Sequence, residues 1–143
     1  MSSVQAFIVQ ANLRRAMLAL ACAVGAVGAQ AQSAMPQWKG EGAVRYVCGG
    51  IGSDESNAMR AAMKEHPLAL LFARSDGAYL ADVQVDIKGR GGAPSLALRA
   101  SGPVCLVDLP AGRYTVDVAT AGGSVQSQSV TVGGSPKTAS FRF

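Results

Sequence analysis

Three side chains with metal-binding chemistry fall within one segment that has the sequence of a helix. Met59, Met63 and His66 are spaced so that they share one face of a predicted helix over about residues 53–66. Thioether and imidazole groups together suit copper, so this face is a candidate metal site. The same methionines are also what a helix needs to pack against a sheet. We therefore favour core packing and keep a small copper-binding protein as the alternative.

Catalytic arrangements find little support in the chain. His66 is the only histidine, so a Ser-His-Asp or Cys-His arrangement would have to use it. It precedes Pro67 at the predicted helix end, where a polar side chain ordinarily caps the last carbonyls. Residues 89–92, Gly-Arg-Gly-Gly, open no helix and so lack the dipole that holds a phosphate. We expect a non-enzymatic protein without a cofactor.

Two cysteines, Cys48 and Cys105, lie in β-forming segments. In an oxidising compartment such a pair in a small domain predicts one disulfide, and two buried free thiols are the alternative. The loop-entropy model assigns the closure of this loop on the order of 4 kcal/mol.

Around these residues, short alternating apolar runs separated by Gly-rich turns predict a mostly β protein. About seven strands, with the helix inserted after the first of them, favour a β-sandwich. Residues 124–132 form a predicted strand that has no charge to guard its edge. This strand is a candidate for pairing with another chain by strand addition, and an interior strand is the alternative.

A turn followed by an alternating strand predicts one corner of the sandwich. Pro110 fixes φ for the turn, and Gly112 can adopt a positive φ there. Tyr114 then begins a strand with its ring directed inward and its hydroxyl within reach of a backbone group across the turn. This arrangement is similar to the tyrosine corner of sandwich domains.

The first 31 residues have the order of a secretory signal peptide. Arg14 and Arg15 precede an apolar run that ends in a small-x-small pattern at Ala31. We expect cleavage near Ala31, with Ala34 as the neighbouring site and a lipid-modified Cys22 as a further alternative. The apolar run is too short to span a bilayer comfortably, so we expect a periplasmic or secreted protein without a membrane span.

The remaining chain divides into a flexible mature N-terminus, residues 32–42, and one sandwich domain, residues 43–143. The chain has 13 Lys and Arg against 9 Asp and Glu, and removal of Arg14 and Arg15 leaves eleven against nine. Because these charges are interspersed and form no basic run, we expect no nucleic-acid binding. The partner is an unknown protein or small ligand.

Two motifs carry a resemblance to a known family. Ala81-Asp82-Val83-Gln84-Val85 and Leu109-Pro110-Ala111-Gly112-Arg113-Tyr114 are similar to the opening strand and the corner of the carboxypeptidase regulatory-like domain. The resemblance covers residues 78–143, and residues 46–80 look like the segment that precedes this domain in small, stand-alone exported bacterial members. It implies a transthyretin-like, Greek-key β-sandwich without catalytic residues of its own. A binding or scaffolding role in the periplasm is the function we expect.

Overall fold

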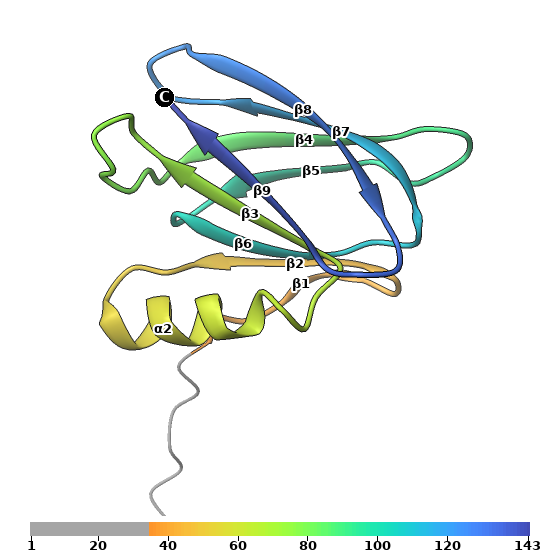
Figure 1. Cartoon of the computed structure of the whole chain (residues 1–143), viewed down its shortest axis with the longest axis horizontal. Helices are drawn as coiled ribbons and strands as arrows, with labels where there is room; N and C mark the ends of the chain where they lie inside the picture. The colour runs from red at the N-terminus through yellow and green to blue at the C-terminus, as the bar shows by residue number, and fades with distance from the viewer. Residues whose placement is uncertain (1–34) are drawn as a thin grey trace, which may run out of the picture. The chain divides into compact units, whose positions relative to one another are not determined.

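The computed structural model describes residues 35–143, which form nine strands and one helix (Figure 1). The strands are β1 (Lys39–Glu41), β2 (Val44–Gly49), β3 (Leu68–Ala73), β4 (Val83–Gly89), β5 (Leu96–Ala100), β6 (Val104–Asp108), β7 (Gly112–Ala119), β8 (Val125–Val132) and β9 (Lys137–Arg142), and the helix α2 spans Ser53–Ala62. The predicted signal peptide, with its cleavage near Ala31 and the alternative at Cys22, lies outside the described residues. Within residues 35–143, no helix has the length and apolar character needed to span a membrane.

The strands form a five-stranded sheet in the order β1-β2-β6-β3-β9 and a four-stranded sheet in the order β5-β4-β7-β8. All neighbouring strands pair antiparallel except β3 and β9, which are parallel. Alternation along β4 buries Val83, Val85 and Ile87 between the sheets. Phe72 of β3 and Phe141 of β9 meet them there, with ring centroids 5.9 Å apart. The predicted β-sandwich is confirmed.

A second, smaller core lies on the outer face of the five-stranded sheet. Strand β6 directs Cys105 and Val107 into the sandwich and Val104 and Leu106 to the opposite face, and all four are fully buried. Helix α2 packs on β6 and β2 and covers this outer face (Figure 1). Met59 of α2 is 0 % exposed in this second core, so core packing is confirmed for this residue.

The helix is shorter than predicted: it ends at Ala62, whereas the sequence predicted an end near His66. Turns follow it, with the Met63 amide donating to Arg60 O and the Glu65 amide donating to Ala62 O. The chain has to reverse before Leu68, which begins β3 and is fully buried. The segment before Leu68 is therefore used for the reversal, and His66 does not belong to the helix.

The N-terminal segment also differs from the sequence prediction. We expected residues 32–42 to be flexible, but Lys39–Glu41 forms β1 and pairs antiparallel with β2. Trp38, which precedes this strand, packs against the second core beside α2. Burial of this aromatic side chain accounts for the ordered strand, since a large apolar contact offsets the entropy of fixing the chain.

The predicted disulfide joins Cys48 and Cys105, whose Cα atoms lie 4.1 Å apart. The two residues face each other in the antiparallel register of β2 and β6. The crosslink therefore connects neighbouring strands of one sheet, rather than strands that face each other across the sandwich. It fixes β2 to β6, the strand whose side chains contribute to both cores.

The tyrosine corner is confirmed, but the role of its glycine is not the predicted one. Tyr114 is 1 % exposed, and its hydroxyl donates to Pro110 O at 2.6 Å. The φ angle of Gly112 is not positive. Instead, a Cβ atom at Gly112 would lie 3.3 Å from Ala93 Cβ and 3.5 Å from Tyr114 Cε2. A side chain at position 112 is thus disfavoured by the close approach of Ala93, not by a left-handed backbone.

Substitutions at Tyr114 should separate the hydroxyl from the ring. We expect Tyr114→Phe to lower the free energy of unfolding by about 1 kcal/mol, since one hydrogen bond is lost. Tyr114→Ala should lower it by roughly 3–5 kcal/mol, because it leaves a cavity in the core. Chemical denaturation measures both, and an unchanged midpoint for Tyr114→Ala would contradict the buried corner.

The difference in stability between the wild-type protein and Tyr114→Phe should also depend on pH. Burial raises the pKa of the Tyr114 phenol above its ordinary value. The neutral phenol therefore contributes stability that is complete below about pH 10 and is lost as the pH rises through the raised pKa. Above about pH 10, the wild-type protein should lose stability relative to Tyr114→Phe.

Candidate functional site

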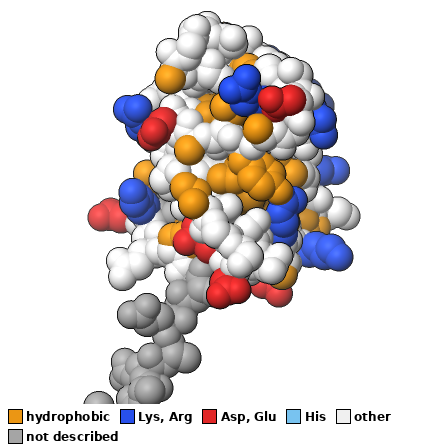
Figure 2. All heavy atoms as spheres, turned by 90° about the vertical axis from the view of Figure 1, so that its left-hand side faces the viewer, with side chains coloured by type: hydrophobic (Ala, Val, Ile, Leu, Met, Phe, Trp, Pro, Cys, Tyr) orange, Lys and Arg blue, Asp and Glu red, His pale blue; other side chains and the backbone are white. Residues whose placement is uncertain are grey.

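Large hydrophobic side chains are exposed together at one end of the sandwich. Ile51 is 65 % exposed in the β2–α2 loop, and Tyr79 is 58 % exposed in the β3–β4 loop. Both line a surface hollow of about 340 Å³, which Pro103 of the β5–β6 loop also lines. Figure 2, which looks onto this end of the molecule, shows hydrophobic side chains gathered near its middle. Such a patch on a small domain is typical of an interaction surface.

A second hollow of about 270 Å³ adjoins the first, since Tyr79 and Pro103 line both of them. It lies on the outer face of the five-stranded sheet, with Leu71 and Ala73 of β3 among its apolar lining residues. Arg60 of α2 and Arg142 of β9 line it as well. We call Ile51, Arg60, Tyr79, Pro103 and Arg142 the Tyr79 face.

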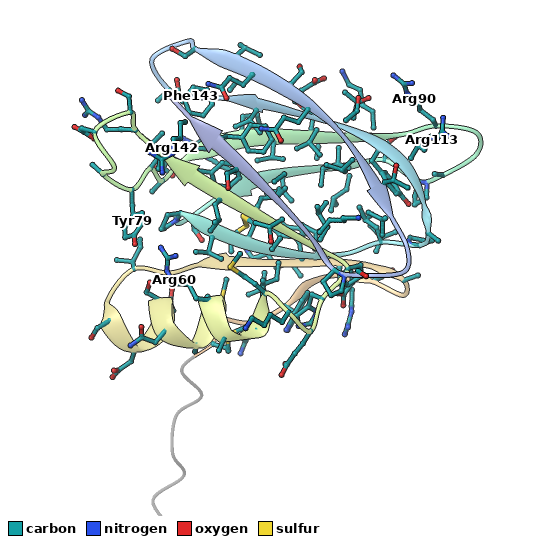
Figure 3. The ribbon with its side chains drawn as sticks, in the orientation of Figure 1. Arg60, Tyr79, Arg90, Arg113, Arg142 and Phe143 are labelled. Atoms are coloured by element: carbon teal, nitrogen blue, oxygen red, sulfur yellow. A yellow bond between two sulfur atoms is a disulfide. The ribbon has the colours of Figure 1, made fainter. Side chains whose placement is uncertain are left out.

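Hydrogen bonds connect Arg60 both to Tyr79 and to its own helix. The Arg60 guanidinium donates to the Tyr79 hydroxyl and, at 3.4 Å, to Ser56 Oγ one turn earlier in α2. Its Cζ atom lies 5.3 Å from the centroid of the Tyr79 ring, and Figure 3 shows Arg60 directed from α2 towards Tyr79.

Backbone hydrogen bonds on both sides of Tyr79 connect its loop to β3 and to the residue that follows β3. The Arg74 amide donates to Ala78 O at 2.7 Å, and the Leu80 amide donates to Phe72 O at 3.4 Å. The Tyr79 face is therefore largely preformed.

The charge of the face comes from its two arginines. A cation that is matched by an acid is found on the four-stranded sheet, where Lys88 Nζ lies 2.8 Å from Asp117 Oδ2. That hydrogen bond lowers the pKa of Asp117 and raises the pKa of Lys88. Among the described residues, no carboxylate lies within 4.0 Å of Arg60 or Arg142. The Tyr79 face therefore combines apolar surface with unneutralised positive charge.

The residues proposed for copper lie elsewhere, and only two of them share a face. Met59 and Met63 both pack in the second core, where Met59 has no exposed surface and Met63 is half-buried. His66 lies beyond the turns that follow α2. Within residues 35–143, no group of three or more His, Cys, Asp and Glu side chains is placed to hold a metal ion.

His66 has a different set of neighbours. Its Nδ1 lies 2.8 Å from Asp108 Oδ1, and Arg45 donates to Asp108 Oδ2 at 2.7 Å. The Trp38 ring contacts both, 4.7 Å from the His66 centroid and 5.1 Å from Arg45 Cζ. Arg45 and Asp108 pair at one end of β2 and β6, whereas Gly49, which precedes the loop that carries Ile51, lies at the other end. This cluster is therefore remote from the Tyr79 face.

The strand predicted over residues 124–132 is β8, which lies at an edge of its sheet among the described strands. Its side-chain amides cross to the other sheet: Gln128 Nε2 donates to Ser140 O at 2.7 Å, and Gln126 Nε2 donates to Arg142 O. These bonds occupy two carbonyls at the exposed edge of β9. They also link β8 to the strand that carries Arg142.

Arg60, Tyr79 and Arg142 were not identified from the sequence. Tyr79 follows an Asp-Gly turn, and Arg60 lies one helical turn after Ser56, but neither spacing points to the other residue. Only the fold brings α2, the β3–β4 loop and the end of β9 to one hollow.

Comparison with models of known protein families gives no match for this chain, and comparison with curated proteins gives none either. The resemblance to the carboxypeptidase regulatory-like domain therefore stays a prediction from its two motifs.

The exposure of the Tyr79 face predicts that it contributes little to stability. Tyr79→Ser removes only a solvent-exposed ring contact and hydrogen bond, so the free energy of unfolding should change by less than about 1 kcal/mol. Ile51→Ser should change the free energy of unfolding by a similarly small amount. Denaturation of both variants beside Tyr114→Ala tests this, and a loss above about 2 kcal/mol for Tyr79→Ser would assign the ring a structural role.

Proposed function

We propose that this protein is an exported, non-enzymatic β-sandwich that binds a partner protein or ligand through the Tyr79 face. The observation that carries the proposal is the pairing of exposed Ile51 and Tyr79 with Arg60 and Arg142, which have no acidic partner among the described residues. Tyrosine and arginine are the residue types that contribute most to binding at protein interfaces. A surface that is largely preformed also loses little entropy when a partner docks.

Two further observations support an exported protein. The disulfide between Cys48 and Cys105 is typical of an oxidising compartment such as the periplasm. The order of Arg14, Arg15, the apolar run and Ala31 is that of a signal peptide. The transthyretin-like resemblance is consistent with a binding or scaffolding role and adds no chemistry of its own.

The copper alternative demands rearrangement. Met59 would have to reach a metal from a position with no exposed surface, because it is buried in the second core. The binding module needs no such change, because four side chains of its face, Ile51, Arg60, Tyr79 and Arg142, are already exposed.

Co-purification of the tagged protein from the cell envelope of its native host tests the proposal. We expect a partner to be recovered with wild type and to be reduced at least fivefold with Tyr79→Ser, because the variant lacks the central ring of the face. Val125→Ser is the control, since Val125 is also hydrophobic and has a similar exposure on β8, 65 % against 58 % for Tyr79. Equal recovery with Tyr79→Ser, or a loss only with Val125→Ser, would contradict this assignment.

A further inference from the structure

The two arginines of the Tyr79 face lie where a ligand would meet apolar and charged groups together. Leu71 and Ala73 line the hollow that Arg60 and Arg142 share. Arginine guanidinium groups bind carboxylates through paired hydrogen bonds, and they do so best when the groups are held in place. Arg60 is held by Ser56 and Tyr79 and retains unused N–H donors for this purpose.

From this arrangement we propose that the Tyr79 face binds a short acidic segment of a partner polypeptide, a specificity that rests on the proposed function. A carboxylate of the segment would lie between Arg60 and Arg142. A neighbouring apolar side chain would occupy the hollow of Ile51 and Pro103. The shared lining of the two hollows by Tyr79 and Pro103 makes both positions accessible to one extended chain.

The size and charge of the face favour a peptide over other anionic partners. A small inorganic anion would leave the hollow of about 340 Å³ unused. A membrane surface or a nucleic acid requires a broad run of cations, whereas two arginines line this face. A segment that alternates acidic and apolar side chains complements both parts of the site.

The molecule provides an internal control for charge alone. Arg90 and Arg113 line a separate hollow of about 220 Å³, and within residues 35–143 neither has a carboxylate within 4.0 Å. Figure 3 shows this pair at the opposite end of the molecule from Arg60 and Tyr79. The tyrosine that lines it, Tyr114, is buried, so this hollow has positive charge without an exposed aromatic ring. Binding driven by net charge would occupy both sites.

The test is an NMR titration of the isotope-labelled protein, purified from the periplasm, with the peptide acetyl-Leu-Asp-Leu-Glu-Leu-amide. We expect amide shifts around Tyr79 and none around Arg113, with saturation in the millimolar range or below. The Asn and Gln analogue of the peptide should bind at least tenfold more weakly. Arg60→Gln and Arg142→Gln should each weaken the acidic peptide about three- to tenfold, and Arg113→Gln should leave it unchanged.

Three outcomes would overturn the inference. No shifts at 5 mM acidic peptide would exclude the site, and shifts at both arginine pairs would mean that charge alone governs binding. Equal binding of the two peptides at Tyr79 would remove the anionic specificity while leaving the binding face intact. Tyr79-dependent co-purification tests the proposed function separately, because it makes no assumption about the charge of the partner.

Discussion

Strand β6 has to bury both of its faces, and the architecture follows from this constraint. Its residues Val104, Cys105, Leu106 and Val107 are all fully buried, with alternate side chains on opposite sides of the sheet. Each of the three aliphatic side chains, Val104, Leu106 and Val107, stabilises the fold by about 1.5–3 kcal/mol relative to exposure. The second sheet covers only one face of β6, so a further layer is required on the other. Helix α2, with Met59 at its centre, provides it.

The size of that layer determines where the candidate site lies. An α-helix with its side chains is about 10–12 Å wide, whereas neighbouring strands are about 4.8 Å apart, so one helix covers about two strands. Helix α2 packs on β2 and β6, and the outer face at the ends of β3 and β9 stays partly open. Leu71, Ala73 and Arg142 are accessible there beside Arg60. The Tyr79 face is thus a consequence of covering β6 with a single short helix.

Periodicity and turn chemistry were sufficient to predict the parts of the fold that depend on local pattern. The sandwich is present, and so is the predicted bond from the Tyr114 hydroxyl to a backbone group, which is Pro110 O. The Cys48–Cys105 disulfide, predicted from the cysteine pair in an oxidising compartment, is present as well. The same reasoning could not predict features that depend on contacts between residues distant in sequence. The helix ends early because the chain must return to β3, and Gly112 is set by packing against Ala93.

The candidate site was unpredictable for the same reason. Its defining residues come from α2, a loop and β9, separated by 19 positions between Arg60 and Tyr79 and by many more up to Arg142. No local period connects them. The sequence indicated a binding role through the absence of catalytic patterns and through a resemblance, and it drew attention to Met59, Met63 and His66 instead. Tertiary structure was needed to show that Met59 is inaccessible and that Arg60 and Arg142 line one hollow.

The central claim, that the Tyr79 face is the binding surface, is tested most directly by photo-crosslinking in the native cell envelope. Ile51 and Val125 are both 65 % exposed, but only Ile51 lies at the Tyr79 face, which makes the pair a matched comparison. A photoreactive residue in place of Ile51 should give a specific crosslinked product, and the same residue in place of Val125 should give none. A product from Val125 alone, or equal products from both positions, would contradict the account.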